Sequence, residues 1–561
     1  MASFSNIMDL TKSIRKFALA NAIKYNGKAN PCAILGHIFG ENPELKKKAK
    51  DVSKEIMKII NEINNLSMEQ QKNELEKISP DMLKKKKEEK RDIFKFLGYQ
   101  PTDKINTAFP PGPEKYPHIG HAKALLLNYM LAKNHNGKFI LRFEDTNPKT
   151  VKKEFYDIML ENFKWLGVAW DELIYASDYM DIFYDKANFI IKKGLAYVDK
   201  SDQDQIKLSR EKGIPTKYRD NSIEENIRLW DEMQHGDEGS SILRLKIDLN
   251  HKNSTMKDPT IFRIIKKNHV RHKDKYNVWP TYDFQNSIMD SISDIDIRLR
   301  SKEFELRAEL QRWIQKELGI KITKTYEFGR FNMTGVLSSG RLIREKIQNN
   351  ELIGWDDPSL TTLVALRRRG FLPEAIKNFV ISTGISKAEA TLTWDDLIMQ
   401  NKRLLDNIAD RYSAIFDPVE LTIMDVPDMR VELHLNPNQK KGGRKMQVTK
   451  NFILSKKDVE NMQDSEITRL MDCINVIKTK NEVCLDSIKY EQFKGKKIIN
   501  WLPSKNNVKI EVLMPDKVVK KGIAEQNISK IKEGDVIQFE RFGFCRLDKK
   551  GDPLKFWFSH K

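Results

Sequence analysis

The segment that most constrains the fold alternates strands and helices around a proline-rich loop. Residues 105–109 have the pattern of a strand, and FPPGPEKYP (109–117) contains four prolines, which remove amide donors and fix φ, so it is a rigid loop. A helix is predicted over 122–134, a continuous buried strand over 138–145 and an amphipathic helix over 151–166. This order predicts a parallel, doubly wound α/β sheet.

The first 95 residues have the apolar spacing of helices. Apolar side chains recur at helical spacing at Ile14, Phe17, Ala18, Ala22 and Tyr25. Gly27 then provides a stop signal, and a second helix is predicted over 44–63. The charge run LKKKKEEKRD (83–92) follows. It favours a solvated helix face or linker, with RNA contact as the alternative.

The remainder of the chain changes character twice. Residues 200–275 are irregular and strand-bearing, which predicts an insertion, and helices are expected over 303–318 and beyond 361. From about 416, short alternating strands such as VIQFERFGF (536–544) are separated by Gly, Pro and Asn. This pattern predicts an antiparallel β-barrel or sandwich.

Composition narrows the class of protein. The 561 residues correspond to about three or four domains. The net charge of +19 fits a polyanionic partner such as nucleic acid or an acidic membrane surface, and equally a lysine-rich solubilising surface. The cysteines Cys32, Cys473, Cys484 and Cys545 form no CxxC pair, which argues against a disulfide framework or a zinc site. The N-terminus lacks a signal-peptide pattern, so a soluble, cytoplasmic protein is expected.

A pair of histidines follows the proline-rich loop in PHIGHAK (117–123). His118 and His121 are spaced i, i+3, which places both imidazoles on one face of the first helical turn. Helix N-termini favour phosphate, and Gly120 allows a nucleotide to approach the backbone closely. The arrangement suits stabilisation of charge on a phosphate undergoing displacement, although two surface histidines near a turn give the same pattern.

These features, with LRFEDTNP (141–148), resemble the glutamyl/glutaminyl family of class I aminoacyl-tRNA synthetases, and in particular its archaeal-type glutamyl branch. Further matches follow in order: KWLG (164–167), GLAYV (194–198), YRDNSIEENIRLW (218–230), MKDPTIFRI (256–264), WPTYDF (279–284), GWDDPSL (354–360) and LRRRGF (366–371). The resemblance is strong over about 100–400 and reaches the C-terminus through QFERFGF.

The resemblance implies a multidomain protein with an α/β Rossmann catalytic domain. The expected regions are a helical N-terminal extension (1–95), the first Rossmann half (96–200), an α+β acceptor-binding insertion (201–275), the second Rossmann half (276–335), an ATP loop with a helical stem-contact region (336–415) and all-β anticodon-binding barrels (416–561).

Two segments are expected to bind ATP by this resemblance. The first comprises Pro110, Pro111, His118, Gly120 and His121, with both histidines catalytic. The second lies in FNMTGVLSSGRLIREKI (331–347), where the family has KMSKS or MSKRK, and contributes Leu337, Ser338, Ser339 and Arg341, the last three as catalytic residues. Because Ser339 replaces the usual second lysine, Arg341 or Arg344 supplies the cation. Taken alone, SSGR fits a plain turn.

The resemblance also implies an amino-acid pocket. Glu144 is expected to take the ammonium, Tyr282 to contact the amino acid and Arg300 to bind its side chain. A guanidinium pairs bidentately with a carboxylate but has no acceptor for an amide, so Arg300 favours glutamate over glutamine. Arg298 was set aside, because a one-residue slip does not bring it into place. The alternatives are that Glu144 is an acid that caps the next helix, that Tyr282 is a core aromatic, and that Arg300 is a surface or sheet-edge arginine.

The chain departs from the family at Ala108, where RFPPEPNG or RFAPNPTG has an arginine that contacts substrate carboxylate. Lys115, Lys104 or another residue is expected to substitute. The activity implied is ligation of L-glutamate to tRNA through a glutamyl-adenylate, with ATP as substrate and Mg²⁺ offsetting charge on the triphosphate. No metal site made of protein ligands is predicted.

The expected partners are glutamate tRNA, with glutamine tRNA as a further possibility, and a protein that docks on residues 1–95, which could instead simply stabilise the catalytic body. KKGGRK (440–445) fits a phosphate-contact loop or a solvated basic turn. No membrane association is expected. The rival hypotheses are a glutaminyl enzyme, a catalytically inactive tRNA-binding paralogue and a small-molecule nucleotidyltransferase.

Overall fold

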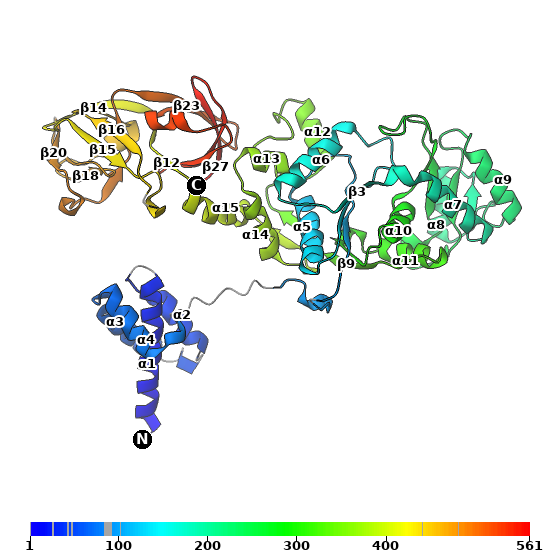
Figure 1. The fold of residues 1–561 in the computed structure, drawn as a ribbon, viewed down its shortest axis with the longest axis horizontal. Helices are drawn as coiled ribbons and strands as arrows, with labels where there is room; N and C mark the ends of the chain where they lie inside the picture. Colours follow the sequence, from blue (N-terminus) through cyan, green and yellow to red (C-terminus); the bar gives the residue numbers. More distant parts are fainter. Residues whose placement is uncertain are drawn as a thin grey trace. The chain divides into compact units, whose positions relative to one another are not determined.

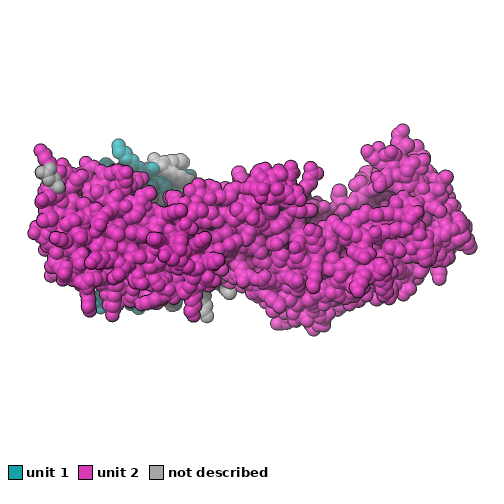
Figure 2. Space-filling view, turned by 90° about the horizontal axis from the view of Figure 1, so that it is seen from above, with its two compact units in different colours: residues 1–92 teal, residues 93–561 magenta. Residues whose placement is uncertain are grey.

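A computed structural model describes the chain except for residues 1, 25–26, 42–43, 46–48, 83–91, 101, 440 and 481. Tyr25 and nearly all of the charge run at 83–92 therefore lie outside the described residues. The chain divides into two compact units, Met1–Asp92 (unit 1) and Ile93–Lys561 (unit 2), which are coloured separately in Figure 2. None of the described helices is long and apolar enough to cross a membrane.

Unit 1 is helical, as its apolar spacing predicts (Figure 1). Its helices are α1 (Ala2–Lys24), α2 (Pro31–Glu41), α3 (Ala49–Asn64) and α4 (Met68–Ile78). Ile14, Ala18 and Ala22 of α1 are fully buried in one core with Ile56 and Ile60 of α3. The helix predicted over 44–63 is α3, which begins at residue 49, and α2 was not predicted.

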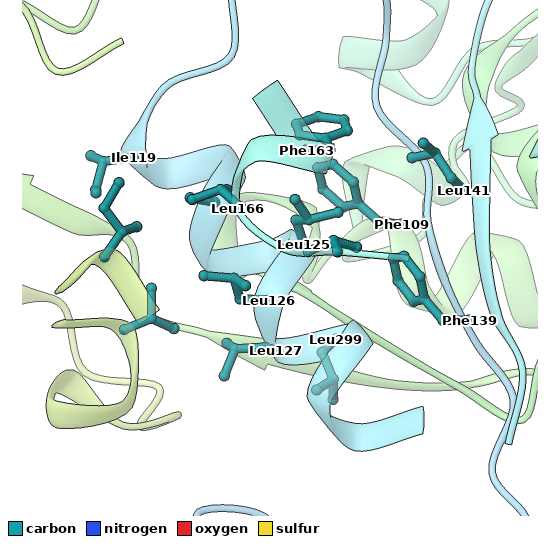
Figure 3. Packing of buried hydrophobic residues seen from close by; sticks show 14 of the residues in the cluster. Phe109, Ile119, Leu125, Leu126, Leu127, Phe139, Leu141, Phe163, Leu166 and Leu299 are labelled. Atoms are coloured by element: carbon teal, nitrogen blue, oxygen red, sulfur yellow. The ribbon is translucent and has the colours of Figure 1, made fainter. Parts of the chain in front are cut away.

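The centre of unit 2 is a parallel sheet, which confirms the prediction for these strands. β1 (Thr107–Phe109), β2 (Phe139–Phe143) and β3 (Glu172–Tyr175) pair in parallel, as do β8 (Ile297–Ser301) and β9 (Lys324–Phe328). The Asp296 amide donates to the Asn106 carbonyl (3.0 Å), which links the starts of β8 and β1. Helices α5 (Ile119–Asn134) and α6 (Lys153–Trp165) cover one face (Figure 3).

Asn128 of α5 replaces part of the strand pairing between β1 and β8. Its side chain accepts from the Leu299 amide (3.0 Å) and donates to the Leu299 carbonyl (2.7 Å). The hydroxyl of Thr107 donates to the Asn128 carbonyl (2.8 Å). This buried asparagine therefore fixes the helix that begins at His118 to both central strands.

Next in the chain is a four-stranded antiparallel sheet of β4 (Ala196–Asp199), β5 (Ile242–Leu245), β6 (Thr260–Ile264) and β7 (Val278–Pro280). Of these strands, β5 and β6 fall within the insertion predicted over 201–275. The helices in and around this sheet are α7 (Met180–Lys192), α8 (Gln203–Lys212), α9 (Ile223–Met233), α10 (Tyr282–Ile292) and α11 (Arg307–Glu317). All of these helices except α8 share a core that includes Trp230, Phe262 and Trp279.

Helices then connect this body to the C-terminal sheets (Figure 1). They are α12 (Gly340–Gln348), α13 (Leu363–Arg368), α14 (Pro373–Thr383) and α15 (Trp394–Ile408), with the short parallel pair β10 (Phe331–Met333) and β11 (Ala390–Leu392). At the junction Arg368 pairs with Asp548 (2.8 Å), and Arg369 donates to the Ser559 carbonyl (2.6 Å).

The C-terminal region is β structure in two seven-stranded sheets. The first has the order β12 (Arg411–Tyr412), β25 (Val536–Phe539), β26 (Gly543–Lys549), β27 (Leu554–His560), β23 (Asn507–Leu513), β24 (Val519–Glu525) and β13 (Ala414–Phe416). The second has the order β21 (Lys497–Ile499), β18 (Ile467–Leu470), β19 (Asn475–Lys478), β20 (Val483–Ser487), β14 (Pro418–Met424), β17 (Asn451–Ser455) and β22 (Leu502–Pro503). The ribbon of β15 (Met429–Leu433) and β16 (Arg444–Val448) and helix α16 (Lys456–Glu460) complete the region.

Two details of this region differ from expectation. VIQFERFGF is a hairpin of β25 and the start of β26, because the chain turns between Phe539 and Gly543. In KKGGRK, Arg444 is 1% exposed and pairs with Glu525 (2.6 Å) and Glu540 (3.1 Å). Arg444 is therefore a buried ion-pair centre, whereas Lys441 and Lys445 are exposed and Lys440 lies outside the described residues. For these lysines the phosphate-contact loop and the solvated turn both stay predictions.

Candidate active site

A cavity of about 770 Å³ opens at the carboxyl ends of β1, β2 and β8, where ligands bind in open α/β sheets. Most of the predicted site residues line it: Pro110, Pro111, His118, Gly120, His121, Glu144, Tyr282, Arg300 and Ser338. Leu337 lines a small adjoining cavity together with Ser338 and His118. Ser339 and Arg341 are exposed on α12 just beyond it.

The two histidines are held against each other at the start of α5. Their ring centroids are 4.1 Å apart. The Gly120 amide donates to Nδ1 of His118 (3.0 Å), and the His118 amide donates to Nδ1 of His121 (3.2 Å). Because each Nδ1 is an acceptor, the neutral rings have their protons on Nε2. Both imidazoles therefore have one Nε2–H left to donate at a cavity wall.

The electrostatics keep these rings neutral. Burial, with a smaller contribution from Lys115, lowers the pKa of His118 to about 4. Burial also holds the pKa of His121 well below its ordinary value. At neutral pH the pair therefore offers two uncharged donors, which suits stabilisation of developing phosphate charge without a proton transfer.

The backbone around the histidines is paired with a distant segment that sequence reasoning missed. The Ile119 amide donates to the Thr361 carbonyl (3.0 Å), and the Leu363 amide donates to the Pro117 carbonyl (2.8 Å). His118 and Thr362 thereby form an antiparallel bridge. The match GWDDPSL ends directly before this segment, but no local spacing indicates the pairing.

Gly120 is required by the histidine turn itself. A Cβ at this position would lie 2.8 Å from Cε1 of His118, closer than carbon atoms pack. The glycine was predicted to admit a nucleotide. The structure adds that any side chain here would displace the His118 ring.

Glu144 lies at the end of β2 in a buried charged network. Its Oε1 accepts from Nε of Arg142 (2.9 Å) and from Nδ2 of Asn286 (3.0 Å). Arg142 also binds Asp290 (2.9 Å). Burial outweighs the effect of Arg142 and raises the pKa of Glu144 to about 7. A ligand ammonium beside Glu144 would favour its ionised carboxylate. Glu144 does not cap α6, whose N-cap is Lys152.

The neighbouring Asp145 and Thr146 do not cap α6 either. Asp145 accepts from the Ser177 amide (2.8 Å) and from the Tyr156 hydroxyl (2.8 Å), which ties the end of β2 to the loop after β3. The N-cap of α6 is Lys152, without a side-chain cap. Glu144 is thus the carboxylate of this motif that faces the cavity.

Arg300 and Tyr282 line the opposite wall. Arg300 is 6% exposed, donates from Nη1 to Oε1 of Gln311 (2.8 Å) and pairs with Glu327 (3.3 Å). It is not a surface or sheet-edge arginine, and burial lowers its pKa. Tyr282 is half-buried on α10, beside Phe304, with ring centroids 5.6 Å apart.

Ala108 is fully buried against Ile140 and Ile295. Of the two lysines expected to replace its missing arginine, Lys104 is exposed and precedes β1, at the strand end away from the cavity. Lys115 lines the cavity near His118.

Sequence reasoning missed several residues in and behind the cavity wall that periodicity could have found. Asn286 does not line the cavity but donates to Glu144, and it lies one turn after Tyr282 on α10. Arg298 lines the cavity and lies two residues before Arg300 on the same face of β8. Lys123 follows the histidines on α5, donates to the Gly329 carbonyl (2.8 Å) and has its pKa lowered to about 8 by burial. Arg298, which the sequence analysis did not place in the pocket, lines the cavity together with Arg300.

Comparison with known proteins identifies the family of the chain. Residues 104–407 match the family model described as tRNA synthetases class I (E and Q), catalytic domain, and residues 409–491 and 498–548 match its anti-codon binding domains. The chain therefore belongs to the class I tRNA synthetases of the glutamate (E) and glutamine (Q) group, which confirms the predicted family.

Individual relatives with a similar sequence are glutamate–tRNA ligases. The glutamate–tRNA ligase of Pyrococcus furiosus is 38% identical, with 99% of this chain and 100% of that protein covered. The glutamate–tRNA ligase of Methanocaldococcus jannaschii is 37% identical, covering 98% and 100%. That of Methanobrevibacter smithii is 34% identical, covering 99% and 100%.

Proposed function

We propose that the chain is a glutamate–tRNA ligase, which joins L-glutamate to the 3′ end of tRNA through glutamyl-adenylate and releases AMP and pyrophosphate. The observation that carries the proposal is one cavity in which two neutral histidine donors face a buried carboxylate and a buried arginine. Full-length likeness to glutamate–tRNA ligases supports the same activity. It does not favour a glutaminyl enzyme or an inactive paralogue.

In the first step the α-carboxylate of glutamate attacks the α-phosphorus of ATP, and pyrophosphate leaves. The Nε2–H groups of His118 and His121 stabilise charge on the phosphates, and the loop Ser338–Arg341 closes on them. Mg²⁺ enters with ATP as its counter-ion. When bound, it would offset negative charge on the triphosphate.

The amino acid is held by three groups around the cavity. Glu144 pairs with the ammonium, and this pairing favours the ionised carboxylate whose pKa burial has raised. Tyr282 contacts the amino acid, and Arg300 binds its side-chain carboxylate. Glutamine lacks the charge that a buried guanidinium requires, so it is rejected.

In the second step the terminal ribose 2′-hydroxyl of tRNA takes the glutamyl group. A second cavity of about 830 Å³ in the insertion shares Asn147 and Arg263 with the active site. Its lining includes the basic residues Lys149, Lys207, Arg210, Lys257 and Arg263. The acceptor end is placed there, and the anticodon on the two C-terminal sheets. Binding weakens steeply with salt.

Charging of purified glutamate tRNA with labelled glutamate, beside ATP–pyrophosphate exchange with and without tRNA, tests the proposal. Incorporation of glutamate but not glutamine is expected, and Arg300→Ala should lower glutamate use strongly. Exchange absent under every condition, with tRNA still bound, would indicate an inactive tRNA-binding protein. Charging glutamine tRNA in parallel determines whether it is a second substrate.

Unit 1 is proposed as a docking module for a protein partner. A pull-down that compares the full chain with a variant lacking residues 1–92 tests this proposal.

A further inference from the structure

Arg298 of β8 is a buried arginine that the proposed reaction leaves unused. It is 2% exposed, donates from Nη2 to Oε1 of Gln311 (2.8 Å) and lies 3.1 Å from Asp290. In the part of the chain that the structure describes, its Nε and Nη1 have no hydrogen-bond partner, although the residue lines the active-site cavity. Unpaired buried donors of a charged group are costly, so these nitrogens point to a ligand.

Arg298 and Arg300 are held as a pair. Side chains alternate along a strand, and Ile297 and Leu299 pack in the core with α5, so both arginines lie on the other face. Both donate to the same Oε1 of Gln311 at 2.8 Å. Gln311 is itself fixed by donation to Asp283 (3.0 Å). Each guanidinium keeps an unpaired N–H group, on Nε and Nη1 of Arg298 and Nη2 of Arg300.

Ala108 lies on the same face of the neighbouring strand. Thr107 and Phe109 contact α5 and its core, so Ala108 points away from α5, as Arg298 does. A methyl group at this position contributes no charge to the wall beside β8. Arg298 therefore supplies a guanidinium to a face on which β1 has none.

The positions of the α-carboxylate and the ammonium of glutamate indicate which of its groups lies at Arg298. The α-carboxylate must reach ATP at the histidine turn, and Glu144 faces the ammonium. The side-chain carboxylate then lies toward β8, where its two oxygens have enough acceptor sites for two guanidinium groups. Burial raises the pKa of Tyr282, and that pKa responds to the charges of Arg298, Glu144 and Arg300, as expected if its hydroxyl lies among them.

We propose that Arg298, side by side with Arg300, binds the side-chain carboxylate of glutamate, and that Gln311 and Asp290 are positioning residues that hold it there. This inference rests on the proposed function. It makes two guanidinium groups, rather than Arg300 alone, responsible for the choice of glutamate over glutamine.

The test is tRNA charging by the full chain with glutamate and ATP varied separately. R298M should raise the glutamate KM by about tenfold or more, as expected for loss of hydrogen bonds to a charged group, and leave the ATP KM within about twofold. The glutamate KM of R298K should lie between those of the wild type and R298M, since lysine keeps the charge but lacks the planar fork of the guanidinium.

A matched control is R244M. Arg244 is also fully buried and pairs with Asp199 (2.8 Å), but it lies on β5 of the insertion. R244M should lower thermal stability without raising the glutamate KM. A glutamate KM that is unchanged in R298M, or raised equally in R244M, overturns the proposal.

A second measurement decides the matter if R298M does not fold. In a crystal structure of the wild-type chain with glutamate, the Arg298 guanidinium should lie within hydrogen-bond distance of the side-chain carboxylate. Contacts from Arg300 and Tyr282 alone would overturn the inference. Failure of the wild-type chain to charge tRNA with glutamate would instead refute the proposed function.

Discussion

The two segments expected at the phosphates of ATP are held very differently. The turn from His118 to His121 is half-buried, capped by its own histidines and paired through its backbone with Thr361–Leu363. In the other segment, Ser338, Ser339 and Arg341 are exposed, and the Ser339 hydroxyl only caps α12. We therefore expect the first segment to be preorganised for ATP and the second to take its working geometry when ATP binds.

This difference separates the kinetic effects expected from each segment. A rigid donor acts on the transition state without reorganisation, so its loss should appear in kcat. An exposed basic residue acts mainly on binding, so its loss should appear in the ATP KM. The predictions below test this separation, from the largest expected effect to the smallest.

His121→Ala should lower kcat for ATP–pyrophosphate exchange by about a hundredfold, because it removes a preorganised donor and the acceptor of the His118 amide. His135→Ala is the matched control, since His135 ends the same helix, is also buried and bonds only to the Gln100 carbonyl in the described contacts. A loss in H121A no larger than that in H135A would contradict the prediction.

Gly120→Ala should lower kcat by about tenfold with little change in the ATP KM, because the new methyl group would displace the His118 ring. Gly36→Ala in unit 1 is the control, since no described atom lies within 4 Å of the position that its Cβ would take. G36A should leave kcat unchanged and raise thermal stability slightly, because alanine is the better helix former. A kcat for G120A equal to wild type would contradict the steric account.

The pH dependence should separate the rigid turn from the glutamate pocket. The pKa of His118 is about 4 and that of His121 is lower than usual, so both rings stay neutral between pH 6 and 8. Protonation of these histidines should therefore not lower kcat in this range. The pKa of Glu144 is about 7, so acidification protonates the ammonium's partner. The glutamate KM should rise about eightfold from pH 7.5 to pH 6.

Steady-state kinetics over this range provide the check. In Glu144→Gln the glutamate KM should be high and independent of pH, since the titrating group is gone. A wild-type glutamate KM that stays constant from pH 6 to 8 would remove Glu144 from the ammonium site.

What could be predicted from the sequence follows the same division. The histidine turn was predictable because capping depends on residues within one helical turn, and the parallel sheet because its strands are separated by clear helix signals. The bridge from His118 to Thr362 was not, since pairing between distant segments leaves no periodic trace. The position of Arg298 in the cavity wall was missed for a similar reason. Strand alternation placed it on the face of Arg300, but only packing shows that Gln311 holds both and leaves nitrogens free.

The smallest effects are expected at α12, where the sequence left Arg341 and Arg344 as alternatives. Both side chains are exposed, but Nε of Arg344 donates back to the Gly340 carbonyl (3.2 Å), so this side chain follows its own helix, whereas Arg341 lies on the first turn. Arg341→Ala should therefore raise the ATP KM by about fivefold, the upper end for an exposed charge pair. Arg344→Ala should change it by less than about twofold.

Added salt sharpens this last comparison. An exposed charge is screened by salt, so the difference in ATP KM between R341A and wild type should shrink at high ionic strength. The loss of kcat caused by His121→Ala should persist. If the KM effects of R341A and R344A were reversed, Arg344 would have to leave Gly340 when ATP binds. If R341A lowered kcat as strongly as His121→Ala, the exposed segment would also contribute to the transition state, and the rigid turn would not be the sole source of preorganised charge stabilisation.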